Sequence, residues 1–199
     1  DIDTGKDPSD EIRWVKFGGA SWTKDGKGFF YSRFDEPKTG EDLKAANKFQ
    51  KIYYHTLGKP QSEDVLVYDR KDQAEWYLTG GVTDDGKYLI IDVNPGSKIE
   101  TGLFYKDLTR PDAPVVELLN KFDAKYSFID NDGSTFFIQS DLDAPRGKVW
   151  AIDTSKPERA NWKELIPQTT DALQGVSSVG GKLIANYLHD AQSRIRVYD

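Results

Sequence analysis

The sequence predicts an all-β fold, a β-propeller of four repeats that each contribute a four-stranded antiparallel blade. A glycine-containing turn recurs four times along the 199 residues, and each turn precedes short runs of aromatic and β-branched residues. Such residues favour strands over helices. A repeat of about 40 to 50 residues that carries four strands is typical of propeller blades. Evenly spaced short strands can also form a β-sandwich, which is the alternative fold at this point.

The four turns share an Asp-Gly or Gly-Gly pair. These dipeptides tolerate the positive φ angles that tight hairpin turns require. The turn glycines Gly26, Gly86, Gly133 and Gly181 are 60, 47 and 48 residues apart. The first interval is the longest because residues 35–48 form a polar insertion, in which residues 41–46 have a short helical pattern.

Three further strands are expected after each of the first three turns, and two after the last. The second strands are expected at residues 29–31, 88–91, 135–138 and 183–187. The third strands are expected at residues 51–55, 102–107, 148–153 and 194–199. Fourth strands are expected at residues 64–68, 114–119 and 162–166, and the last repeat has none of its own.

One additional apolar segment, residues 12–17, precedes the first turn. This segment could supply the strand that the last repeat lacks, which would close a four-bladed ring and cover exposed strand edges. It could instead complete a blade whose other strands lie outside this sequence, which would leave both ends open. We therefore expect one propeller domain over residues 1–199, with a strand at residues 12–17.

Composition and charge argue against several classes of partner. The net charge is -6, and no stripe of Lys or Arg offers the basic surface that nucleic acids require. No apolar run approaches the roughly 18 residues of a membrane helix. The sequence has no cysteine, hence no disulfide or thiolate site, and it shows no signal or transit peptide. The expected compartment is cytoplasmic or periplasmic.

The sequence motifs provide no complete catalytic or metal site. A serine peptidase needs a nucleophile, a base and an orienting acid, but no G-x-S-x-G elbow is present. The two histidines, His55 and His189, are separated and are expected to be hydrogen-bonded structural residues. Residues 130–133 match part of a calcium loop but lack its full spacing, so a hairpin turn explains them better. We expect no metal and no cofactor.

Several stretches resemble the prolyl oligopeptidase (prolyl endopeptidase) family. They are VKF at 15–17, ASWTKDGKGFFY at 20–31, QKIYYHTLG at 50–58, PQSEDVLVY at 60–68, DDGKYL at 84–89, LFYKDL at 103–108 and YLHD at 187–190. The matches keep their order along the whole chain. The resemblance implies a fragment of a seven-bladed propeller. In that family the propeller caps an α/β-hydrolase domain and restricts access to short, proline-containing peptides.

The same resemblance implies four substrate-lining residues, namely Phe17, Tyr77, Asn94 and Ser97. Phe17 matches an aromatic residue that lines the pocket, and Tyr77 matches a position that is usually apolar. Asn94 and Ser97 lie in a loop where the family often carries an Arg and a Cys or Thr. Here the Arg is absent, and so is the D-P-x-N-R motif that usually follows, which weakens the expected role of this loop. The competing interpretation of Phe17 and Tyr77 is packing between blades.

The resemblance also places the family's Ser, Asp and His on the hydrolase domain, which this sequence lacks. The chain alone is therefore expected to be inactive. Its expected partners are that α/β-hydrolase domain and short proline-containing peptides. Two other functions stay open: a freestanding or engineered propeller that serves as a protein-interaction scaffold, and a standalone enzyme with a site on the propeller axis.

Overall fold

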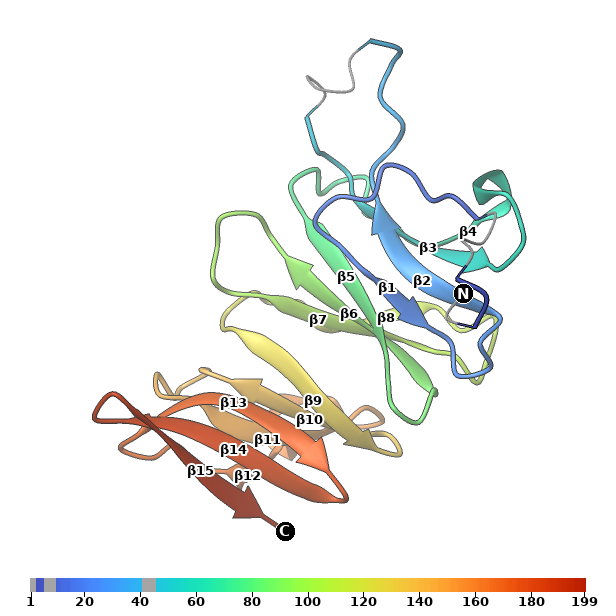
Figure 1. Ribbon diagram of the computed structural model, residues 1–199. Coiled ribbons are helices and arrows are strands. Elements are labelled where there is room, and N and C mark those ends of the chain that lie inside the picture. The colour runs from blue at the N-terminus through green and yellow to red at the C-terminus, as the bar shows by residue number, and fades with distance from the viewer. Residues whose placement is uncertain (1–2, 6–9, 41–45) are drawn as a thin grey trace. The chain divides into compact units, whose positions relative to one another are not determined.

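The computed structural model describes residues 3–5, 10–40 and 46–199, so most of the expected helical pattern at residues 41–46 lies outside the described residues. Consecutive strands form four separate sheets, which confirms the prediction of four blades (Figure 1). Three sheets have four strands, and the last has three because no strand follows β15 in this sequence. No helix among the described residues is long and apolar enough to cross a membrane.

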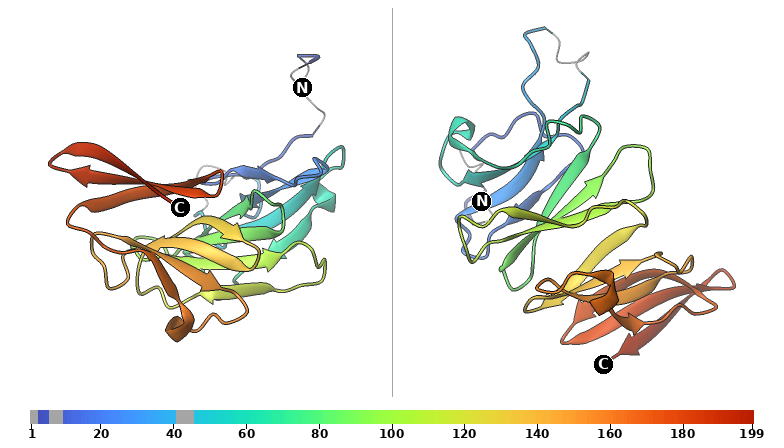
Figure 2. Two further views of the ribbon diagram at one scale, coloured as in Figure 1. Left: turned by 90° about the horizontal axis from the view of Figure 1, so that it is seen from below. Right: turned by 180° about the vertical axis from the view of Figure 1, so that it is seen from behind.

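The strands follow the chain order within every sheet. The first sheet contains β1 (Ala20–Trp22), β2 (Gly28–Arg33), β3 (Lys51–Thr56) and β4 (Val65–Tyr68). The second contains β5 (Tyr77–Val82), β6 (Tyr88–Asn94), β7 (Gly102–Asp107) and β8 (Val115–Leu119). The third contains β9 (Tyr126–Asp132), β10 (Thr135–Ser140), β11 (Lys148–Asp153) and β12 (Lys163–Ile166). The fourth contains β13 (Ala172–Val179), β14 (Lys182–His189) and β15 (Gln192–Tyr198), an antiparallel meander visible in both views of Figure 2.

The chain divides into two compact units. One comprises Asp1–Ser97 and Tyr105–Val115, and the other comprises Lys98–Phe104 and Val116–Asp199. In the first unit β2 contacts β5, and Phe30, Ile52 and Leu78 are among the buried apolar residues. In the second unit a buried cluster contains Val149, Ile166, Leu173, Ala185 and Tyr187. Each unit thus has an apolar core of its own.

The turns are of two kinds. Gly133 and Ser134 form a two-residue connection, as do Gly180 and Gly181, and the three glycines have positive φ angles. The first two turns are longer: residues 23–27 connect β1 to β2, and residues 83–87 connect β5 to β6.

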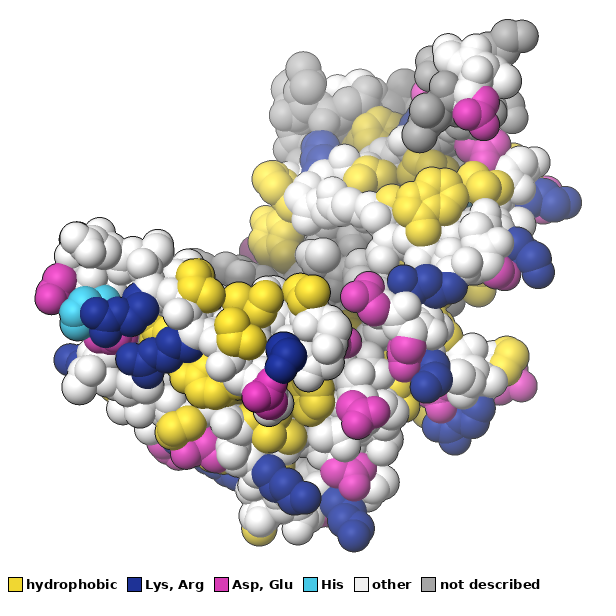
Figure 3. All heavy atoms as spheres, turned by 60° about the horizontal axis from the view of Figure 1, so that its bottom comes forward, with side chains coloured by type: hydrophobic (Ala, Val, Ile, Leu, Met, Phe, Trp, Pro, Cys, Tyr) yellow, Lys and Arg dark blue, Asp and Glu magenta, His cyan; other side chains and the backbone are white. Residues whose placement is uncertain are grey.

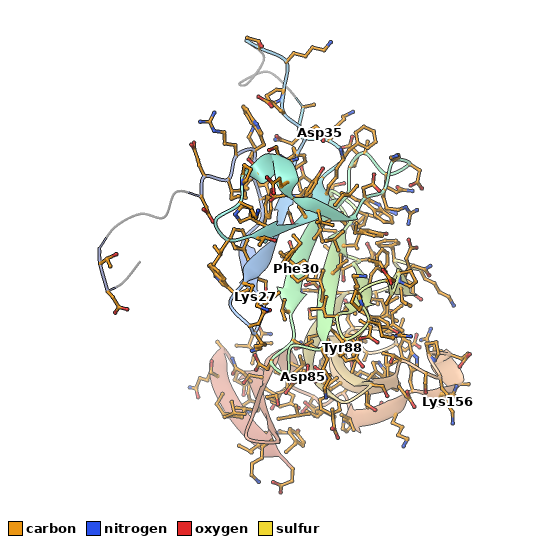
Figure 4. All side chains as sticks on the ribbon, turned by 90° about the vertical axis from the view of Figure 1, so that its right-hand side faces the viewer. Lys27, Phe30, Asp35, Asp85, Tyr88 and Lys156 are labelled. Atoms are coloured by element: carbon orange, nitrogen blue, oxygen red, sulfur yellow. The ribbon has the colours of Figure 1, made fainter. Side chains whose placement is uncertain are left out.

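Each of these longer turns is closed by an aspartate side chain. In the turn between β5 and β6, Asp85 Oδ1 accepts hydrogen bonds from Thr83 Oγ1 at 2.7 Å and from the Lys87 N–H at 3.0 Å. Asp25 has the same two partners one repeat earlier, Thr23 and Lys27. Figure 4 shows Lys27 and Asp85 at these turns, with Phe30 and Tyr88 on the strands that follow.

The strand expected at residues 12–17 is not formed. Trp14 and Phe17 have φ angles of 63° and 54°, which interrupt an extended backbone. The Gln61 side chain instead bonds both the N–H and the carbonyl of Arg13, at 3.0 and 3.1 Å. The Phe34 N–H donates to the Trp14 carbonyl at 3.1 Å. The segment is therefore an irregular strap that is bonded to residues of the first sheet and its loops.

Candidate functional site

The predicted site residues Phe17 and Tyr77 are in contact. Their rings meet edge to face, with centroids 5.6 Å apart and planes at 88°. Phe34 also contacts Tyr77, with ring centroids 6.3 Å apart and planes at 79°. Phe34 is buried, whereas Phe17 is 68% exposed. The cluster therefore has a fixed base and an aromatic face that is open to solvent.

Gln50 fixes the strap that carries Phe17 against strand β5. Its buried side chain donates from Nε2 to the Lys16 carbonyl at 2.9 Å and accepts the Leu78 N–H on Oε1 at 2.7 Å. The Ser32 hydroxyl donates to the Leu78 carbonyl at 2.5 Å. Both backbone groups of Leu78 are thus satisfied by buried side chains, and Phe17 is held next to Tyr77 although it lies outside any strand.

Asn94 lies opposite Tyr77 in the sheet. The two residues pair across the β5–β6 ladder, where Tyr77 begins one strand and Asn94 ends the other. Asn94 and Ser97 are both exposed. Gly96, with a φ angle of 90°, passes close to the Glu75 carbonyl, so the loop turns back toward the start of β5. The structure thus brings Phe17, Tyr77 and Asn94 together at one end of the second sheet, with Ser97 on the adjoining loop.

The roles of Gln50 and Ser32 could not be predicted from the sequence. Gln50 begins the QKIYYH stretch, and its only signal was a polar side chain directly before an apolar strand. Nothing in the spacing shows that it spans from residue 16 to residue 78.

His55 lies between two carboxylates. Its Nδ1 is 2.7 Å from Asp64 Oδ1, its Nε2 is 3.2 Å from Asp10 Oδ2, and its side chain is fully buried. Burial alone lowers the pKa of His55. The hydrogen bonds and negative charges of Asp64 and Asp10 outweigh that effect, so the pKa is raised above its usual 6.5. Because both ring nitrogens face carboxylates, His55 does not have the arrangement of a general base beside a serine.

His189 belongs to an ion cluster at the end of the last sheet. Its Nδ1 is 2.7 Å from Asp171 Oδ1, and Arg194 and Arg196 each place a nitrogen 3.5 Å from Asp171 Oδ2. The hydrogen bond from His189 lowers the pKa of the buried Asp171 below its usual 3.8, and the nearby positive charges add to this effect. In Figure 3 a cyan histidine side chain is visible on the surface beside dark-blue basic side chains. Among the described residues both histidines form their hydrogen bonds and ion pairs with aspartates, His55 with Asp64 and Asp10 and His189 with Asp171 and Asp190, which fits the expectation of structural residues.

The partial calcium-loop motif is a hairpin turn. Asp130 Oδ1 accepts the Asn131 N–H at 2.8 Å, and Asn131 Nδ2 donates to the Gly133 carbonyl at 3.2 Å. Among the described residues no group of three or more His, Cys, Asp or Glu side chains could hold a metal ion. The predicted site residues of the first unit thus form an aromatic and amide surface around Tyr77.

Comparison with known proteins gives a consistent match over the full length. Residues 1–199 match the family described as the prolyl oligopeptidase N-terminal beta-propeller domain. A prolyl endopeptidase of Elizabethkingia miricola is 34% identical over 199 residues, which are 100% of this chain and 28% of that protein. Prolyl oligopeptidase A of Amanita bisporigera is 37% identical over 181 residues, which are 85% of this chain and 23% of that protein.

A solved structure agrees with the sequence matches. Prolyl oligopeptidase B from Galerina marginata, bound to a 35mer hydrolysis and macrocyclization substrate, superposes with a TM-score of 0.88 at 29% identity. The superposition covers 100% of this chain and 28% of that chain. The chain thus spans between a fifth and a third of the length of the proteins it matches.

Proposed function

Since this chain belongs to the prolyl oligopeptidase family, as its N-terminal β-propeller domain, we propose that it is the non-catalytic part of a serine endopeptidase. That enzyme cleaves short proline-containing peptides. The propeller restricts access to the catalytic centre and lends side chains to the substrate site. An α/β-hydrolase domain is its partner and supplies the Ser, Asp and His that carry out acyl transfer.

The surface formed by Phe17, Tyr77 and Asn94 carries this proposal. A proline ring is apolar and rigid, and an exposed aromatic face held edge-on against a second ring offers it a matching contact. Asn94, which pairs with Tyr77 across the two strands, carries an exposed amide that can donate to a peptide carbonyl and accept from a peptide N–H. Gln50 holds the surface in place before the ligand arrives, which lowers the entropy cost of binding.

The first test is a Phe17→Ala substitution in the enzyme that contains this propeller. We expect kcat/KM for a chromogenic proline-containing peptide to fall roughly five- to ten-fold, mostly through KM, because an aromatic contact with the substrate is lost. Val65→Ala is the matched control, because Val65 is 60% exposed on β4 and lies outside this surface. Equal kinetics for the two variants would contradict a substrate role for Phe17.

A second measurement tests whether catalysis requires the hydrolase domain and whether that domain binds this chain. The purified chain should not cleave the peptide, and the isolated hydrolase domain should capture it in a pull-down. Turnover by the chain alone that a serine-reactive phosphonate abolishes would contradict the proposal. Failure to bind the hydrolase domain would favour the interaction-scaffold alternative.

A further inference from the structure

A cavity of about 490 Å³ opens in the second unit between the third and fourth sheets. Its walls come from β9, from the end of β10 with the loop that follows, and from the start of β13. Ser140, at the end of β10, pairs with Tyr126, at the start of β9. In the second sheet, the equivalent pairing joins Asn94 to Tyr77. The cavity thus lies at the same end of the third and fourth sheets that the site proposed above occupies on the second sheet.

The first strands of the third and fourth sheets, β9 and β13, each contain a bulge where they line the cavity. In the β9–β10 ladder Asp130 and Phe128 have partners and Ile129 has none. In the β13–β14 ladder Leu173 and Gly175 have partners and Gln174 has none. Ile129 and Gln174 both line the cavity, whereas β5 pairs with β6 without interruption. Bulges redirect side chains and are over-represented beside functional sites.

The loop after β10, which lines the cavity with residues 145–147, is held by hydrogen bonds to the segment that leads into β13. The Leu173 N–H donates to the Arg146 carbonyl at 2.8 Å, and the Arg146 N–H donates to Gln168 Oε1 at 2.8 Å. Arg146 Nη1 donates to the Thr170 carbonyl, which leaves other guanidinium N–H groups available. Arg146 is therefore held in place at the cavity wall.

Three polar side chains of the lining have no partner among the described residues. They are the Lys125 ammonium, the Ser127 hydroxyl and the Gln174 amide. The charged lining consists of Lys125, Arg146 and Asp141, two positive groups and one negative, in a chain whose net charge is -6. The Lys125 N–H bonds Asp141 Oδ1 at 2.8 Å, so that acid is already engaged. The cavity thus offers a net positive charge and unused hydrogen-bond donors.

We propose that this cavity is a second peptide subsite, which binds a carboxylate-bearing segment of the substrate. The carboxylate pairs with Lys125 and Arg146, while Ser127 and the bulged Gln174 bond the peptide backbone. The carboxylate can come from an acidic side chain or from the C-terminus of the peptide. This inference rests on the proposed function, because it assumes that proline-containing peptides reach this domain.

The test is a titration of the isotope-labelled chain, followed by its backbone amide resonances. Three peptides share one proline-containing core: one amidated with a Glu, one amidated with a Gln, and one with Gln and a free C-terminus. We expect saturable shifts at Ser127 and Gln174 with a carboxylate-bearing peptide, and weak shifts with the neutral one. Comparing the Glu peptide with the free-acid peptide identifies which carboxylate is bound.

The variant Lys125→Gln should weaken binding of the carboxylate-bearing peptide roughly three- to five-fold, and added salt should reduce the difference. Lys163→Gln is the matched control, since Lys163 is exposed on β12 and does not line the cavity. Shifts at Leu78 and Asn94 without shifts at Ser127 and Gln174 would overturn this inference and leave the proposed function intact. Absence of shifts at all four residues would overturn both. Shifts of equal size with the neutral peptide would overturn the carboxylate assignment.

Discussion

His55 links ionisation to the stability of the first sheet. Its pKa is raised in the folded chain by Asp64 and Asp10, whereas an unfolded chain returns it to about 6.5. A raised folded pKa means that protonation stabilises the fold. This contribution is complete below pH 6.5 and is lost as the pH rises through the folded pKa. Asp10 also accepts the Gly58 N–H at 2.7 Å. The same cluster therefore holds the chain just before the strap against the loop that follows β3.

We therefore expect the urea midpoint of the chain to fall between pH 6 and pH 9. His55→Gln should remove that slope and, at pH 6, cost on the order of 3 kcal/mol, because two buried carboxylates lose their cation. His189→Gln is the control, since it leaves the His55 cluster intact and should keep the slope. The same slope in His55→Gln as in the unsubstituted chain would contradict the assignment.

At the scale of elements, Gly28 sets how closely β2 and β3 approach. A Cβ atom at this position would lie 2.1 Å from the His55 carbonyl oxygen and 2.6 Å from Tyr54 Oη. Gly28 pairs with Thr56 at the end of this ladder. The glycine after the KDGK turn is thus required by packing across the strand pair.

Gly28→Ala should lower the free energy of unfolding by roughly 1 to 3 kcal/mol, because the neighbouring backbone must move. Gly81→Ala is the matched control on β5, where an added Cβ meets nothing within 4 Å and φ is not left-handed. It should be neutral or slightly stabilising, since alanine restricts the unfolded chain. Urea unfolding of both variants checks the pair, and equal midpoints would contradict the packing argument.

The elements that could be predicted from sequence are those with a local signal. Asp-Gly and Gly-Gly turns and aromatic strands repeat along the chain, and they located the four sheets. The strand expected at residues 12–17 was wrong, because alternation of apolar residues cannot reveal that Gln61 takes up the Arg13 backbone. The bulge at Gln174 was not predicted either, since it depends on the register with β14. Register and long-range hydrogen bonds are tertiary properties that spacing does not encode.

At the scale of the whole molecule, the candidate site likewise combines residues that could be predicted from the sequence with residues that could not. The family resemblance identified Phe17, Tyr77 and Asn94, and the structure brings these three together. Their role toward a substrate stays a prediction. Gln50, which holds them, could not be identified, because its partners lie 34 and 28 residues away in the sequence.

The last sheet has consequences for the behaviour of the chain in solution. β15 is an edge strand of a three-stranded sheet, so one side of its backbone has no neighbouring strand in that sheet. Ile195 and Val197 on this strand are 58% and 59% exposed, and Leu188 on β14 is 45% exposed. An edge strand with exposed apolar side chains and unpaired backbone groups is a template for pairing with another chain.

We therefore expect the isolated chain to self-associate, with a mass by light scattering that rises above 22.5 kDa as concentration increases. Val197→Lys should hold the mass near that of the monomer, because a charge on an edge strand opposes pairing. Ile99→Lys, at a loop residue that is 75% exposed, adds the same charge away from the edge and should associate like the unsubstituted chain. A monomeric mass for the unsubstituted chain at all concentrations would show that the β15 edge is protected in solution. Equal suppression by both lysines would mean that overall charge, rather than this edge, governs association.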